Sequence, residues 1–172
     1  MMPFERTAHD VEQLFLAHQR PLWRFLYRLT GDAELASDAV QETFARLVER
    51  DPGLPVHRGW LFKVATNIAL ETLRTQRRRW WILRRSPLRA PVGDPTPPAD
   101  AVAEANDRRR LVRAALATLP PRDRAALLLR EEGCSHREIA EAIDTTTGSV
   151  GTIVARAIDR LARSLPLDAE EL

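Results

Sequence analysis

The sequence predicts an all-α protein. Apolar residues make up 44% of the 172-residue chain and charged residues 29%, which is typical of folded globular proteins. Glycine occurs only seven times, whereas alanine, leucine, arginine and glutamate, which favour helices, are abundant. Apolar residues recur at intervals of three and four, and no long stretch alternates β-branched with polar residues. Composition and periodicity therefore both favour a helical fold.

Three helices are predicted in residues 1–85, which we expect to form one small domain. The first carries apolar residues at helical spacing over residues 11–29 and ends at a TGD sequence. The second spans about residues 33–50, and the loop DPGLPVHRG at residues 51–59 follows it. The third begins near Trp60 and continues directly into the basic sequence RTQRRRWW.

A proline-rich linker is predicted at residues 86–101. The sequence SPLRAPVGDPTPPAD contains five prolines in fifteen residues. Because proline lacks an amide donor and disfavours helix at the preceding residue, we expect this stretch to be extended. The linker divides the chain into two small helical domains, residues 1–85 and 102–166, with a short tail at residues 167–172.

The second domain ends in a pattern typical of a helix-turn-helix. Pro121, in the sequence LPPRD, suits the first position of a helix, and the sequence EEGCS predicts the turn after that helix. Residues 136–165 then read as a short helix, a turn of about three residues and a longer helix. Asp144 stands where the turn needs a positive φ, which aspartate tolerates better than most residues. An ordinary αα-hairpin has the same pattern, so the pattern alone leaves both interpretations open.

Positive charge is concentrated between Arg74 and Arg89, where seven arginines occur without an acidic residue. One face of the third helix extends this charge upstream. Its candidate DNA-binding residues are Trp60, Lys63, Asn67, Glu71, Arg74, Arg77 and Arg78. Cations bind phosphates, an amide reads base edges and aromatic rings stack on bases, as binding to single-stranded DNA requires. A solvated amphipathic face would look similar, but the unrelieved arginine run favours nucleic acid.

Asp38 and Glu42, one helical turn apart, are a candidate metal or acid–base pair. A metal-dependent nuclease needs a further carboxylate on the same ion, and none stands nearby in the sequence. Cys134 and His136 are too few ligands for a structural zinc site. The sequence also has no glycine-rich phosphate loop and no Ser-His-Asp arrangement. We therefore expect no enzymatic activity, no metal and no cofactor, and we interpret the acidic pair as a surface open to protein docking.

No apolar run approaches the roughly 20 residues needed to span a bilayer. The N-terminal sequence MMPFERTAHDVEQ carries charges where a signal peptide needs an apolar core. A single cysteine cannot form an internal disulfide, which fits a reducing compartment. These features predict a cytoplasmic protein without membrane insertion.

With these features in place, the chain resembles the extracytoplasmic-function sigma factors, the smallest sigma-70-type subunits of bacterial RNA polymerase. Region 2 of that family is similar to YRLTGDAELASDAVQETFARL at residues 27–47 and GWLFKVATNIALETLRTQRRR at residues 59–79. Region 4 is similar to LATLPPRDRAALLLREEGCSHREIAEAIDTTTGSVGTIVARAIDRLARSL at residues 116–165. The matched segments cover most of the chain, in the order of the family and with its linker.

The resemblance implies roles for residues of the first domain. A D-x-x-Q-E-x-F element that docks on the largest catalytic subunit of the polymerase matches Asp38, Gln41, Glu42 and Phe44. The third helix corresponds to the one that meets the minus-ten promoter element as it melts. The loop at residues 51–59, with His57 and Arg58, corresponds to the one that captures a flipped base. Ser37 and Glu71 depart from the family pattern, which usually has glutamate and often aspartate at these positions.

For the second domain the resemblance implies binding to the minus-thirty-five duplex and to the flap of the second-largest catalytic subunit. The candidate duplex-binding residues are Arg137, Thr147, Ser149, Thr152, Arg156 and Arg160. The family often reads G-T-V-K-S-R-L-x-R-A-R in the second helix, whereas this chain reads GSVGTIVARAI. Gly151, Ile153 and Ile158 therefore replace residues that are often basic. We expect this unit to depend more on DNA shape than on arginine–guanine contacts.

The sequence thus predicts a sigma factor that binds core RNA polymerase and opens promoter DNA, with a separate anti-sigma factor as the family's common regulator. A stand-alone helix-turn-helix regulator is the alternative, and a helical adaptor that binds only protein is a third interpretation. A regulator needs only the C-terminal duplex reader. A sigma factor also needs the helix of Asn67 joined to the docking surface of Asp38, so the first domain discriminates between them.

Overall fold

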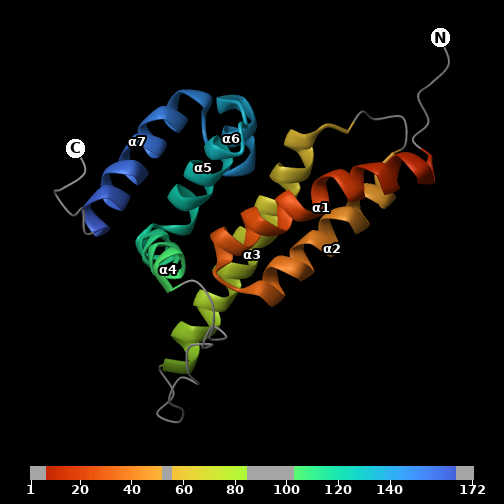
Figure 1. Cartoon of the computed structure of the whole chain (residues 1–172). Helices are drawn as coiled ribbons and strands as arrows, with labels where there is room; N and C mark the ends of the chain where they lie inside the picture. Colours follow the sequence, from red (N-terminus) through yellow and green to blue (C-terminus); the bar gives the residue numbers. More distant parts are fainter. Residues whose placement is uncertain (1–6, 52–55, 85–102, 166–172) are drawn as a thin grey trace.

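The computed structural model describes residues 7–51, 56–84 and 103–165, which contain no strand. Figure 1 shows the helices in two groups that pack side by side, one formed by the first three helices and one by the last four. The described helices are α1 (Ala8–Thr30), α2 (Ala33–Glu49), α3 (Arg58–Arg84), α4 (Ala103–Thr118), α5 (Pro121–Glu131), α6 (His136–Ala142) and α7 (Thr147–Ser164). The predicted all-α fold is confirmed.

Helices α1 and α2 form a hairpin whose ends are set by local capping. Thr7 begins α1 in a reciprocal capping box with Asp10. Gly31 ends α1 with a φ of 76°, a left-handed conformation that glycine adopts without strain. Asp32 then accepts two backbone hydrogen bonds from the first turn of α2. The TGD sequence therefore ends one helix and begins the next, as predicted.

Helix α3 packs on this hairpin with its N-terminal half, while its C-terminal half extends beyond the other helices (Figure 1). At its start, Nδ1 of His57 accepts a hydrogen bond from the backbone N–H of Trp60 at 3.0 Å. Phe62 is fully buried and lies edge-on to Phe25, with ring centroids 5.2 Å apart. The other buried residues of α3 include Leu61, Ala65 and Ala69. The inward face of the helix fixes which residues point outward.

The predicted helix-turn-helix is formed by α6 and α7. Asp144, in the turn between them, has a φ of 53°, as its position in the sequence predicts. Arg122 of α5 fixes this turn, because its Nε donates to the carbonyl oxygen of Ile143 at 2.6 Å and its Nη2 to that of Asp144. Ser135 and Glu138 begin α6 with a capping box. The turn into α7 is therefore held by α5 as well as by its own backbone geometry.

The two groups of helices share one continuous buried cluster, in which α5 packs against α1 and α3, and α6 against α3. Arg124 of α5 is 9% exposed, and its Nη1 donates to the carbonyl oxygen of Leu29 at 2.8 Å. Its Nη2 donates to the carbonyl oxygens of Ala117 and Leu119, both at 3.1 Å. Burial lowers the pKa of this guanidinium. Arg124 thus ties the end of α1 to the turn between α4 and α5.

The first three helices fall within the predicted domain of residues 1–85, and the last four within that of residues 102–166. The predicted linker at residues 86–101 and the tail at residues 167–172 lie outside the described residues. Within the described ranges, no helix has the length and apolarity needed to cross a membrane.

Candidate polymerase and nucleic-acid interfaces

The acidic surface predicted on α2 is present. Asp38, Gln41 and Glu42 are exposed and follow one another at helical spacing. Asp38 and Glu42 line a hollow of about 160 Å³ between α2 and α3, together with apolar atoms such as those of Ile68. An acidic rim around a partly apolar hollow suits a protein partner that offers basic and apolar side chains.

Phe44, which the resemblance grouped with these residues, lies in the core. Its side chain is 7% exposed and packs edge-on against Phe15, with ring centroids 4.9 Å apart. The structure therefore gives Phe44 a position inside the α1–α2 hairpin rather than on the acidic surface. Burial on this scale lets it orient α2 but leaves almost no area for a partner.

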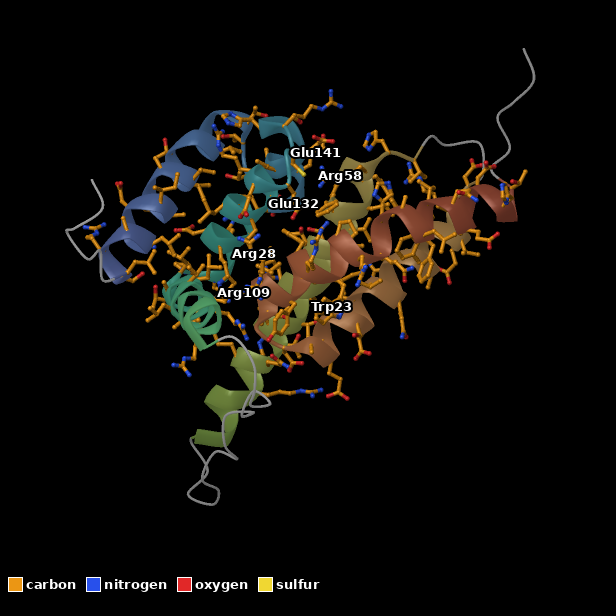
Figure 2. All side chains as sticks on the ribbon, viewed as in Figure 1. Trp23, Arg28, Arg58, Arg109, Glu132 and Glu141 are labelled. Carbon is orange, nitrogen blue, oxygen red and sulfur yellow. The ribbon has the colours of Figure 1, made fainter. Side chains whose placement is uncertain are left out.

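Ser37 also has a role within the hairpin. Its hydroxyl accepts a hydrogen bond from Nε1 of Trp23 at 3.0 Å and donates to the carbonyl oxygen of Ala33 at 2.9 Å. Trp23, labelled in Figure 2, stacks on Tyr27 with ring centroids 5.2 Å apart. The serine that replaces the family's usual glutamate is thus a link between α1 and α2.

The outer part of the α3 face is exposed as predicted. Asn67, Glu71 and Arg74 all lie on the surface, and Nη1 of Arg74 pairs with Oε2 of Glu71 at 3.0 Å. Arg77 and Arg78 are exposed further along the same helix. An amide followed by several cations on one helix can meet base edges and phosphates together.

The first two turns of α3 differ from this prediction, because they face the second group of helices. Nη2 of Arg58 pairs with Oε2 of Glu132 at 2.7 Å, and its Nη1 donates to the backbone carbonyl of Glu132. Nζ of Lys63 pairs with Oε2 of Glu141 at 3.0 Å. Figure 2 shows Arg58, Glu132 and Glu141 where α3 meets α5 and α6. Two of the predicted DNA-binding cations are therefore already bound to carboxylates.

Trp60 and His57 mainly support the start of α3. The Trp60 ring is half-buried, and the guanidinium of Arg50 lies 4.8 Å from the ring centroid. His57 is exposed and caps the helix. Residues 52–55 of the predicted base-capturing loop lie outside the described residues, so only its two ends are described.

Helix α7, the predicted DNA-reading helix, presents part of the face predicted for it. Val150, Val154 and Ala157 are buried, whereas Thr152 is exposed on the opposite side. Ser149 is half-buried, and its hydroxyl lies 2.8 Å from that of Thr146. An added Cβ at Gly151 would meet nothing within 4 Å, so a partner can approach the backbone closely there. Thr147 and Arg137 are exposed near the start of this helix and on α6.

Arg156 and Arg160 both bind a buried carboxylate of α5. Asp123 is 5% exposed and accepts hydrogen bonds from Nε and Nη2 of Arg156, at 3.2 and 3.0 Å, and from Nη1 of Arg160 at 3.1 Å. Hydrogen bonding to Asp123 raises the pKa of Arg156. Both guanidiniums keep further N–H groups on their exposed sides. Their geometry relative to α5 is therefore fixed before any phosphate binds.

The sequence gives no indication of the pairing of Asp123 or of the acidic residues that face α3. Asp123 stands in the first turn of α5, where an acidic residue is ordinary, so its partners 33 and 37 residues away leave no local pattern. No local pattern marks the pairing of Glu131 and Glu132 in the EEGCS turn, or of Glu141 in α6, with cations more than 70 residues upstream. Only the excess of acid after residue 90 and of base before it hints at attraction between the two halves.

Among the described residues, no group of three or more His, Cys, Asp or Glu side chains is arranged to hold a metal ion. Cys134 is partly buried, and burial together with the nearby Glu138 raises the pKa of its thiol to about 11. At neutral pH this thiol is protonated, which makes it a poor nucleophile.

Comparison with known families follows the same division of the chain. The model of sigma-70 region 2 matches residues 14–79, which contain the acidic surface and most of α3. The model of sigma-70 region 4 matches residues 109–161, which contain the helix-turn-helix. Each half of the chain thus matches the region of the family that its surface features indicated.

Curated relatives carry both regions. The ECF RNA polymerase sigma factor SigL of Mycobacterium tuberculosis is 34% identical over 92% of this chain and 88% of its own length. SigG of the same species is also 34% identical over 92% of this chain. The chain spans about half the length of SigG, 50%, and 63% of SigE of Mycolicibacterium smegmatis.

Solved structures share the fold. The sigma factor RpoE of Bartonella quintana, in complex with the anti-sigma factor NepR, superimposes with a TM-score of 0.68 at 22% identity, over 94% of this chain and 99% of that one. CnrH in complex with the cytosolic domain of CnrY gives a TM-score of 0.61 at 22% identity, over 91% and 88% of the two chains. SigL is 34% identical over 88% of its own length, and the models of both sigma-70 regions match in the order of the family. The chain therefore belongs to the ECF family of RNA polymerase sigma factors.

Proposed function

We propose that this chain binds core RNA polymerase and directs it to promoters, where α3 binds the minus-ten element as it opens and α7 binds the minus-thirty-five duplex. One observation carries the proposal: a surface suited to single-stranded DNA and a helix-turn-helix occur in one chain beside an acidic docking surface. Promoter opening needs all three. It needs no chemistry at the DNA, and we propose that the chain is not an enzyme and has no cofactor.

The acidic surface of Asp38, Gln41 and Glu42 is proposed to contact the largest catalytic subunit of the polymerase, with Phe44 orienting α2 from within. The second half is proposed to contact the flap of the second-largest subunit. Because the polymerase and its DNA lie in the cytoplasm, we propose that the chain acts there. The solved neighbour RpoE is bound to the anti-sigma factor NepR, which supports an anti-sigma factor as a further partner.

A stand-alone helix-turn-helix regulator is less well supported. Such a protein has no need of residues 14–79, which match sigma-70 region 2 and carry two separate surfaces. A helical adaptor that binds only protein would not need the exposed cations of α3. Both alternatives predict that the purified chain gives no transcript with core polymerase.

Run-off transcription with purified core polymerase and a promoter library tests the proposal. The expected result is a set of transcripts that start at defined positions and depend on the added chain. The absence of open complexes on every template would contradict the sigma factor assignment.

Two variants then separate the docking and opening surfaces. Asp38→Ala is expected to weaken binding to core polymerase while leaving binding to duplex DNA unchanged, because it removes one exposed charge from the docking surface. Asn67→Ala is expected to retain core binding and to impair promoter opening, because it removes the amide that can meet a base edge. Core binding is measured by surface plasmon resonance and opening by permanganate footprinting. Equal opening by wild type and Asn67→Ala would rule out this role for the amide.

A further inference from the structure

We propose that Arg130 and His136 form a clamp for one backbone phosphate of the DNA duplex that α7 binds, and that this phosphate binds together with a proton on the imidazole. The proposal rests on the proposed function, because it takes α7 as the helix that reads the duplex. Neither residue belongs to the duplex-binding set that the sequence predicts. Both lie within the last four helices, so the clamp needs nothing from the first three.

The two side chains meet without a carboxylate between them. Nη1 of Arg130, in the last turn of α5, lies 3.0 Å from Nε2 of His136, the first residue of α6. Arginine can only donate hydrogen bonds, so the ring nitrogen is the acceptor, and a histidine ring accepts only when it is neutral. Both side chains are exposed, and within the described residues neither has another hydrogen bond or ion pair.

The charged groups around the pair are engaged elsewhere. The nearby carboxylates of α5 and α6 each have another partner: Glu131 binds Arg28, Glu132 binds Arg58, Glu138 binds Ser135, and Glu141 binds Lys63 and Arg137. On the side of α3, His57 interacts electrostatically with Glu138. Helix α7 has no charged residue before Arg156. Arg130 is therefore the charged group that meets the imidazole directly.

A proton on the ring turns this pair into an anion site. The protonated ring carries N–H groups on both nitrogens, so it can no longer accept the hydrogen bond from Arg130. Two cations at such a distance repel each other unless an anion lies between them. A phosphate oxygen can accept charge-assisted hydrogen bonds from both groups. Phosphate binding is therefore expected to take up a proton, and the affinity for DNA to rise as the pH falls.

The place of the pair in the fold suits a contact with the DNA backbone. In a helix-turn-helix the first helix crosses the backbone while the second lies in the major groove, and here these helices are α6 and α7. His136 begins α6 and directly precedes Arg137, a predicted duplex-binding residue. The clamp consists of side chains rather than backbone amides, since Ser135 already caps the first turn of α6. Such a contact adds affinity and position but no sequence preference.

The test measures the affinity of the full chain for a short mixed-sequence DNA duplex by fluorescence anisotropy. A mixed sequence is sufficient, because phosphate contacts do not depend on the bases. His136→Gln keeps a side chain that can accept from Arg130 but cannot be protonated, and Arg130→Gln removes the cation. The matched controls are His9→Gln and Arg24→Gln, at exposed positions of α1. Circular dichroism and urea midpoints verify that every variant folds like wild type.

Wild type and both controls are expected to bind the duplex about threefold or more tightly at about pH 6 than at about pH 8, because histidine ordinarily changes charge in this range. His136→Gln is expected to match wild type at the higher pH and to lose most of the gain at the lower one. Arg130→Gln is expected to bind more weakly at both. It is also expected to reduce the slope of log affinity against log salt by about one, the loss of one phosphate contact. A purely structural role for the pair would change neither the pH dependence nor the salt slope.

The clamp is overturned by a pH dependence in His136→Gln equal to that of wild type, and equally by an unchanged salt slope in Arg130→Gln. A wild-type affinity that does not vary with pH overturns it as well. Run-off transcription keeps these outcomes apart from failure of the proposed function. Transcripts that depend on the wild-type chain, with unaltered duplex binding by both variants, leave the sigma factor assignment in place and remove the clamp. A pH-dependent contact that both variants weaken, without any transcript, supports the clamp and contradicts the assignment.

Discussion

The contacts of Asp123 change the interpretation of the two arginines on α7. The arginines at the middle and end of α7 were predicted to meet phosphates, and both are bound to this buried carboxylate instead of extending freely into solvent. A carboxylate buried with two guanidiniums is satisfied, whereas the same carboxylate without them carries an uncompensated charge. The pair of arginines is therefore part of the packing of α5 against α7 as well as part of the proposed surface for DNA.

Asp123→Ala tests this arrangement. We expect a lower urea midpoint than wild type, because three hydrogen bonds between α5 and α7 are lost. Arg156→Ala and Arg160→Ala, combined with it in double-mutant cycles, are expected to show coupling to Asp123. Additive effects of the mutations would contradict a shared network. Arg163→Ala, near the end of the same helix and away from Asp123, is the control.

At the scale of elements, the helices were largely predictable because their signals are local. The TGD sequence, Pro121 at the start of α5 and the positive φ of Asp144 all follow from preferences of single residues at helix ends and turns. Phe44 could not be placed in the same way. It shares the sequence motif of the exposed acids, and only the packing of α1 against α2 decides that it points inward.

The short helix α6 depends on its capping box and is therefore expected to be sensitive to acid. Hydrogen bonds from the backbone and hydroxyl of Ser135 lower the pKa of Glu138 below its ordinary value of 4.5. A lowered pKa means that the stabilisation is present above about pH 4.5 and is lost as the pH falls through the pKa of the folded state. We expect the free energy of unfolding to fall with pH in this range, as measured by urea titration.

Glu138→Gln isolates this effect. Glutamine at the third helical position can still close a capping box but does not titrate, so the variant is expected to lose stability less steeply towards acid pH. Glu12→Gln, on the exposed face of α1, is the control and should keep the wild-type slope. An unchanged slope in Glu138→Gln would show that other carboxylates dominate the acid response.

At the scale of the whole molecule, the contact between the halves is the part that the sequence did not predict. The paired residues are separated by 74 to 103 positions. Nothing in the local sequence around an exposed glutamate indicates which distant residue it pairs with. The proline-rich sequence predicted two helical domains, yet gave no indication that the first three and the last four helices share a core. Long-range pairing depends on the packing of all seven described helices, which periodicity does not specify.

Arg124→Leu tests how far the halves stabilise each other. The substitution replaces the guanidinium with an apolar side chain and leaves three carbonyl groups without their donor. We expect a loss of about 2 kcal/mol in the free energy of unfolding, since buried hydrogen bonds to a charged group are worth about 1.5–3 kcal/mol. Urea denaturation followed by circular dichroism measures it. A loss below about 0.5 kcal/mol, the size expected for a surface substitution, would contradict the role of Arg124.

The length of α3 has a mechanical consequence. Its 27 residues form one continuous helix about 40 Å long, since each residue adds about 1.5 Å. Its N-terminal end contacts α5 and α6, and its middle borders the hollow lined by Asp38 and Glu42. Its C-terminal half carries the exposed arginines. A stiff rod cannot shift at one of these places without moving at the others. If polymerase and promoter bind as proposed, they and the second half of the chain act on the same rigid helix, so that a displacement of its C-terminal end also moves Arg58.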